Sequence, residues 1–188
     1  MMKLSEESRV SEVTSVTSLI LSSKTVIYQL AKWIAIFAII VMFLSLMSGV
    51  IVRYVLSTNL GWVTEVPNLM FPWLTVSAIV AAAAKNEHIG INLIVDNLPV
   101  FMRRLILIAI NALAVIAFTM IAYRGLTVID IAGGQRLPIT KIAMSWAYWS
   151  VVVGFAALAL ISLLNIGLLL AGREEPTTSQ VSQGEEAL

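Results

Sequence analysis

The sequence contains no cysteine, a single histidine and few charged side chains. Only 12% of its 188 residues are Asp, Glu, Lys or Arg, about half the share of a soluble domain, so charge cannot cover a water-facing surface. The lack of cysteine excludes a disulfide scaffold, thiol redox chemistry and cysteine-ligated metal. A net charge of +1 without a basic cluster excludes a nucleic-acid binder. A soluble globular domain and a disordered chain are excluded as well.

Apolar residues are abundant: they make up 59% of the chain, and the mean hydropathy is +0.93. A helix needs about 20 largely apolar residues to cross the hydrocarbon core, and four uncharged runs meet this requirement. We place the spans at residues 33–52, 66–84, 105–123 and 148–170. The fourth run begins earlier, at 142, but residues 145–149 are typical of an interfacial aromatic belt. Such continuous runs exclude the alternating strands of a membrane barrel, so we predict an all-α integral membrane protein.

The segments between and around the spans contain no further folded domain. We expect a polar cytoplasmic tail over residues 1–26, a four-helix membrane domain over 27–172 and a disordered cytoplasmic tail over 173–188. Residues 89–98, between the second and third spans, form an amphipathic pattern that predicts a segment lying in the membrane interface until Pro99. Residues 124–141 contain Gly133, Gly134 and Pro138, which predict a turn.

The distribution of basic residues predicts the orientation. With both termini in the cytoplasm, eight of the twelve Lys and Arg residues lie inside and four lie outside, as the positive-inside rule favours. The polar start, with three glutamates in its first 12 residues, is unlike a cleavable signal peptide. We therefore expect the first span to remain as an uncleaved anchor.

The sequence predicts no catalytic, cofactor-binding or metal-binding residue. His88 is the only histidine, which excludes a bis-histidine haem within one chain and favours a contact at the membrane interface. The four predicted span interiors contain no ionisable residue, whereas carriers usually keep some there. Their strongest polar groups, Asn111 and Asn165, are expected to bond neighbouring helices. We therefore predict a protein that is not an enzyme.

Pairs of small residues four positions apart predict close helix packing. These pairs are Ser45 and Gly49, Ser77 and Ala81, and Gly167 and Ala171. A small bundle that packs closely and contains no site of its own is best interpreted as a subunit.

An ordered set of motifs resembles a known family. Arg53 and Tyr54 close the first span, residues 62–65 read WVTE, residues 71–74 read FPWL, residues 88–89 read HI and residues 98–99 read LP. Together with the four spans, this order is similar to the small membrane subunit of tripartite ATP-independent periplasmic (TRAP) transporters. Thr64, Ala78 and Val152 depart from residues common in that family.

The resemblance implies a role in the bacterial inner membrane. In that family a periplasmic binding protein delivers an organic acid, and a large membrane subunit carries it inward with an ion gradient. The small subunit would scaffold the large one, here expected to be a separate chain, and help to dock the binding protein. The resulting structural or interface candidates are Arg53, Trp62, Glu65, Trp73, His88, Ser45 and Gly49.

Two questions stay open at this stage. Arg53 and Glu65 either form an ion pair that fixes the first two helices or remain two solvated interfacial charges. The alternative function is a small channel or carrier that works as an oligomer, with a pore lined by Asn111, Asn165, Ser45 and Ser77. A membrane anchor for a redox enzyme is a third interpretation, which the single histidine and the missing cysteine oppose.

Overall fold

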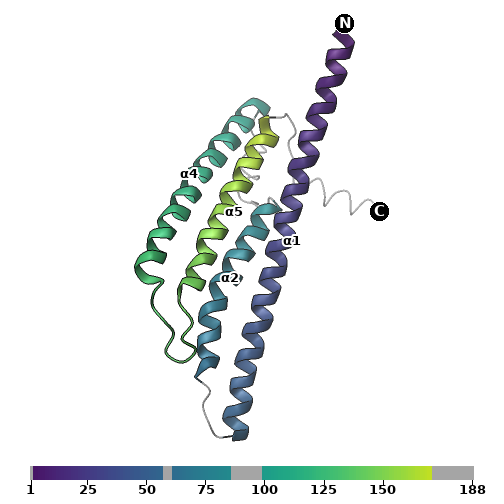
Figure 1. Cartoon of the computed structure of the whole chain (residues 1–188). Coiled ribbons are helices and arrows are strands. Elements are labelled where there is room, and N and C mark those ends of the chain that lie inside the picture. The colour runs from purple at the N-terminus through teal and green to yellow at the C-terminus, as the bar shows by residue number, and fades with distance from the viewer. Residues whose placement is uncertain (1, 57–60, 86–98, 171–188) are drawn as a thin grey trace, which may run out of the picture.

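The structure, a computed structural model, contains four long helices in the part of the chain that it describes (Figure 1). They are α1 (Met2–Leu56), α2 (Trp62–Ala84), α4 (Val100–Ala132) and α5 (Ser145–Leu170). The structure describes residues 2–56, 61–85 and 99–170, and of residues 2–16 and Val100 it describes only the backbone. The predicted interfacial segment, His88 and the C-terminal tail lie outside these residues.

Each of the four helices is long and apolar enough to cross a membrane, which confirms the predicted all-α fold with four spans. The helices exceed the predicted spans at several ends. α1 begins at Met2, so the polar residues expected to form a separate tail continue the first membrane helix. α4 continues past Arg124 to Ala132, so the turn occupies only the second half of the segment predicted for it. The reason is that residues 125–132 contain no proline and only two polar side chains, Thr127 and Asp130, so they do not interrupt the helix.

The helices form a row in the order α1, α2, α5 and α4 (Figure 1). α1 and α2 are antiparallel neighbours, as are α4 and α5, and α2 packs against α5 in the middle of the row. The N-terminal part of α1 extends beyond the other helices (Figure 1). We call the end of the row near Trp62 the hairpin end, because the connection from α4 to α5 lies there, and the opposite end the Lys85 end.

The buried core of this row is small and is made largely of short side chains. Its main cluster joins α1, α2 and α5 through Ala31, Val80, Ala83, Ala84, Leu158 and Ile161. At Gly154 of α5 a Cβ atom would lie 1.7 Å from Cγ1 of Val76 in α2, so only glycine allows the two helices to approach this closely. Large apolar side chains on the outer faces of α1 and α4, such as Phe37, Phe43, Leu113 and Ile116, remain exposed. Those faces are suited to lipid or to another membrane protein.

Candidate functional site: the hairpin end

The first turns of α2 are attached to α1 by a hydrogen bond to a backbone carbonyl. Pro67 lies inside α2 and has no N–H, so the Val63 carbonyl four residues earlier lacks its usual helical donor. The Ser45 hydroxyl of α1 donates to this carbonyl oxygen at 3.1 Å. Ser45 is only 5% exposed, so it supplies a donor where water has little access.

Gly49, one turn further along α1, permits the close approach that this hydrogen bond requires. A Cβ atom at Gly49 would lie 2.5 Å from Cγ1 of Val63. The Ser45–Gly49 pair, predicted as a packing surface, therefore packs inside this chain against α2. Its role in contacts with another subunit stays a prediction.

The connection between α4 and α5 is a short hairpin, residues 133–144. An isolated antiparallel bridge pairs Arg136 with Ala143, and the Leu137 N–H donates to the Ile142 carbonyl at 3.0 Å. At the tip, Lys141 has a left-handed backbone with a φ of 58°. Gly133, Gly134 and Pro138 thus lie in a turn, as the sequence predicts.

Glu65 of α2 binds the tip of this hairpin. Its Oε1 accepts a hydrogen bond from the Ile139 N–H at 2.8 Å. Its Oε2 accepts one from the Thr140 N–H at 2.7 Å and one from the Thr140 hydroxyl at 2.7 Å. Glu65 is only 4% exposed, and three donors to two carboxylate oxygens match an acceptor-only, ionised side chain.

The Arg53–Glu65 ion pair does not occur in the described part of the chain. Arg53 is exposed at the end of α1, whereas the Glu65 carboxylate is bound by the hairpin. The solvated alternative is also wrong for Glu65, because this residue is buried. The sequence therefore identified Glu65 as a contact residue, and the structure shows that its partner is the hairpin.

Two further contacts hold the hairpin end together. The Trp73 indole N–H of α2 donates to the Trp146 carbonyl at the start of α5, at 3.0 Å. Leu69, Leu137 and Ala147 form a second small core beneath the hairpin. Trp73 is thus a fold contact, whereas Trp62 has an exposed fraction of 38% and suits the interface between membrane and water.

The two asparagines pair with each other across α4 and α5. Asn165 Nδ2 donates to Asn111 Oδ1 at 3.4 Å, and Asn111 Nδ2 donates to the Leu107 carbonyl of its own helix at 2.9 Å. The expectation that they bond neighbouring helices is therefore confirmed for this pair. The fourth residue assigned to a pore in the alternative function, Ser77, is buried at 7% exposure.

The chemistry of the hairpin end is that of a structural contact. Both oxygens of its buried carboxylate accept hydrogen bonds from this chain, which leaves Glu65 poorly placed to act on a substrate. Among the residues that the structure describes, no group of three His, Asp or Glu side chains is placed to hold a metal ion. Ile139 and Thr140 were missed in the sequence, because donation by their backbone N–H groups has no residue-type signal.

Comparisons with known proteins identify the family. The sequence model of the family described as tripartite ATP-independent periplasmic transporters, DctQ component, matches residues 42–172. The chain is 29% identical over 176 residues to protein y4mM of Sinorhizobium fredii, an alignment that covers 93% of this chain and 32% of that protein. The chain thus spans about a third of the length of this relative. It is also 23% identical over 135 residues to a Haemophilus influenzae protein named as a TRAP transporter small permease, covering 72% of this chain and 82% of that protein. Because the family match covers most of the chain and all four helices contribute to it, the chain belongs to the DctQ component family of the TRAP transporters.

Proposed function

We propose that this chain is the non-catalytic small permease subunit of a TRAP-type secondary transporter. It would scaffold a large membrane subunit that takes up an organic acid. An ion gradient would drive this uptake, and a periplasmic binding protein would deliver the acid. In this proposal both termini lie in the cytoplasm of a bacterium, and the hairpin end faces the periplasm. The sequence supports this orientation, because the predicted topology then leaves four Lys and Arg residues outside and eight inside.

One observation carries the proposal. The polar side chains singled out within the helices contact this chain itself: Ser45 binds α2, Glu65 binds the hairpin, and Asn165 binds Asn111. Around them, large apolar side chains on α1 and α4 are exposed. A row of helices in which these polar side chains contact the chain itself, and which has broad apolar faces, is suited to packing beside a larger membrane protein.

The hairpin supports a second part of the proposal, contact with the binding protein. Glu65 holds the hairpin tip in a defined position, and Arg136 and Lys141 on the hairpin are both exposed. Exposed charges at a protein surface steer partners and set the register of docking. We therefore place the docking contact of this subunit at the hairpin.

The length of one relative is consistent with a chain that works beside a larger partner. In the Sinorhizobium fredii protein, a segment similar to this chain accounts for only 32% of the length.

Reconstitution into liposomes tests the proposal. A large TRAP membrane subunit, a periplasmic binding protein and an organic acid that it binds are combined under an ion gradient, and uptake is measured with and without this chain. We expect the two membrane proteins to purify together and uptake to require both. Failure to co-purify, together with unchanged uptake when this chain is omitted, would contradict the proposal.

The oligomeric channel is tested in the same system. Liposomes that contain this chain alone should show no solute flux, because Asn111 and Asn165 bond each other. Flux that is lost on the double change of Asn111→Leu and Asn165→Leu would support the channel and overturn the subunit proposal.

A further inference from the structure

One side of α2 is exposed along almost the whole helix. Beyond Val63, the exposed residues of α2 recur at alternating intervals of four and three positions, so they share one side of the helix. They are Thr64, Asn68, Phe71, Thr75, Ala78 and Ala82, with Ile79 at the edge. We call this set of residues the α2 face.

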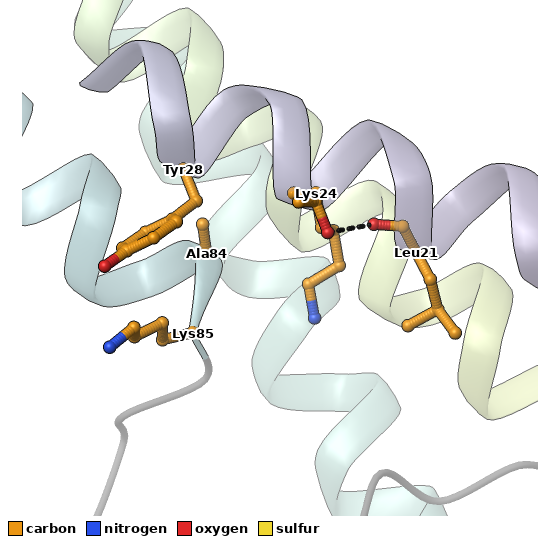
Figure 2. Close-up of a pocket in the computed structure, with 6 residues that line it drawn as sticks. Leu21, Lys24, Tyr28, Ala84 and Lys85 are labelled. Atoms are coloured by element: carbon orange, nitrogen blue, oxygen red, sulfur yellow. Dashed lines mark hydrogen bonds between the residues drawn. The ribbon is translucent and has the colours of Figure 1, made fainter. Parts of the chain in front are cut away.

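The other sides of α2 are already covered by this chain. α1 covers one side near the hairpin end, where Gly49 packs against Val63. It covers the Lys85 end as well, where Tyr28 lies beside Ala84 and both line a small pocket (Figure 2). α5 packs against another side of α2 in the middle of the row. The α2 face is therefore the side that neither neighbouring helix occupies.

The composition of the α2 face differs from that of the outer faces of α1 and α4. Those outer faces present large apolar side chains, such as Phe37, Leu113 and Ile116. The α2 face consists mostly of threonine, asparagine and alanine, and α2 is the least apolar of the four helices by hydropathy. Small and polar residues are enriched where membrane helices pack together, because they let the backbones approach and can hydrogen-bond across the contact.

Asn68 has hydrogen-bonding groups that this chain leaves open. Its side-chain amide makes no hydrogen bond to any residue that the structure describes. Its backbone carbonyl lacks the usual helical donor, because Pro72, four residues later, has no N–H. Ser45 supplies a donor of this kind to the Val63 carbonyl, whereas no side chain within the described ranges does so for the Asn68 carbonyl.

These open groups lie at the depth of the hydrocarbon. The uncharged run between Glu65 and Lys85 covers residues 66–84, and Thr75 is its middle residue. Asn68 precedes Thr75 by seven residues, which is about 10 Å along the helix axis, whereas half of the hydrocarbon thickness is about 15 Å. Lipid tails cannot donate or accept hydrogen bonds at this depth, so the open groups favour a protein partner with polar side chains over lipid.

We infer that the α2 face binds a transmembrane helix of the large membrane subunit, and that this helix carries a hydroxyl or amide side chain opposite Asn68. Such a side chain can donate to the Asn68 carbonyl or to its amide oxygen. The small side chains of Thr75 and Ala78 then allow the two backbones to approach. The inference rests on the proposed function, which supplies the partner.

A second copy of this chain fits the α2 face less well. Two copies of the same topology would be related by a two-fold axis along the membrane normal, so the two α2 helices would meet in parallel and each residue would lie level with its counterpart. Phe71 lies between Asn68 and Thr75 on the face and has an exposed fraction of 59%. The two phenylalanine rings would therefore meet and hold the small residues apart. A different helix can place a small residue opposite Phe71.

Photocross-linking tests where the large subunit binds. The full chain with Phe71 replaced by p-benzoylphenylalanine is co-purified with the large TRAP membrane subunit used in the reconstitution, and the complex is irradiated. We expect a cross-link to the large subunit from position 71 and none from the same replacement at Phe43. Phe43 is the matched control, because its exposed fraction is 62% and it lies about 200° around α1 from Ser45, which contacts α2.

The affinity between the two subunits tests the hydrogen bond and the close approach. Asn68→Leu should raise the Kd of the complex in mixed micelles about three- to ten-fold, as expected for one interhelical hydrogen bond. Ala78→Leu should raise the Kd about ten-fold, because the added side chain blocks the approach of the partner helix. Ala117→Leu is the control, because Ala117 is exposed on α4, and its Kd should stay within about two-fold of the wild type. All three changes are at exposed positions, so the circular dichroism of the chain alone should be unchanged.

Four outcomes would overturn the inference. A complex that cross-links from Phe43 and not from Phe71 would place the contact on the outer face of α1 and leave the proposed function intact. A cross-link between two copies of this chain from Phe71 would assign the α2 face to a dimer. An unchanged Kd in both Asn68→Leu and Ala78→Leu would show that the α2 face meets lipid. The absence of any complex would contradict the proposed function as well.

Discussion

Pro67 and Ser45 offer a direct test of how α1 is attached to α2. Pro67 cannot donate to the Val63 carbonyl, and the Ser45 hydroxyl donates to it instead, at 3.1 Å. Pro67→Ala would supply the missing N–H donor from within α2. We therefore predict that Ser45→Ala is costly in the wild type and mild in the Pro67→Ala background.

The magnitude follows from what each variant leaves at the Val63 carbonyl. In the wild type, Ser45→Ala leaves the Val63 carbonyl, a buried acceptor, without the Ser45 donor, which costs about 1–3 kcal/mol. In the Pro67→Ala background the carbonyl keeps a helical donor, and the loss is that of an ordinary interhelical hydrogen bond in a membrane, about 0.6 kcal/mol. The expected coupling energy is therefore about 1 kcal/mol. The gain in helix propensity from replacing Pro67 occurs in both Pro67→Ala variants and cancels in the cycle.

The assay is a double-mutant cycle on the free energy of unfolding, measured by titrating denaturing detergent into the purified protein in mixed micelles. Ser48→Ala is the control, because the Ser48 hydroxyl donates to the Ser45 carbonyl within α1, at 2.7 Å. Its cost should be the same in both backgrounds. A Ser45–Pro67 coupling below about 0.3 kcal/mol, within the range of independent sites, would refute the reasoning.

Three other predictions concern the hairpin and the middle of the row. Glu65→Gln should increase trypsin cleavage after Arg136 and Lys141, because an amide cannot accept all three hydrogen bonds from Ile139 and Thr140. Thr140→Val removes only the hydroxyl and should increase cleavage less. Unchanged cleavage in both variants would argue against the contact. Gly154→Ala should lower the free energy of unfolding by about 1–3 kcal/mol through overpacking against Val76, and adding Val76→Ala should restore it. Gly134→Ala is the control and should be neutral, because a Cβ atom there meets open space. An equal effect at both glycines would contradict this packing. Lys141→Gly should raise the free energy of unfolding by about 1 kcal/mol, because Lys141 has a left-handed backbone with a φ of 58°. A lower free energy of unfolding in the same detergent titration would show that the contacts of the lysine side chain contribute more than the backbone strain costs.

Several residues of the hairpin end could be identified individually from the sequence. Ser45, Gly49, Glu65 and Trp73 were all identified, and each makes a contact there. The residues that they contact could not be predicted from the sequence. Glu65 is 74 residues from Ile139, and its donors are mostly backbone N–H groups, which every residue except proline possesses. Of the two alternatives left open for Arg53 and Glu65, neither describes Glu65, because its carboxylate is buried and bound by the hairpin; two charges expected at one interface need not be neighbours in space.

The number of helices long and apolar enough to cross a membrane, and their helical nature, were determined by the sequence alone. The physical reason is that a charge in hydrocarbon is costly and a backbone there must satisfy its own hydrogen bonds, so uncharged runs of sufficient length can form only helices. The order of the helices in the row, the start of α1 at Met2 and the binding of the hairpin by Glu65 were decided only by the tertiary structure. These features depend on which helix surfaces pack together, such as Gly154 against Val76. Apolar helices of similar composition do not identify their neighbours by composition, because the neighbours are determined by how individual side chains fit.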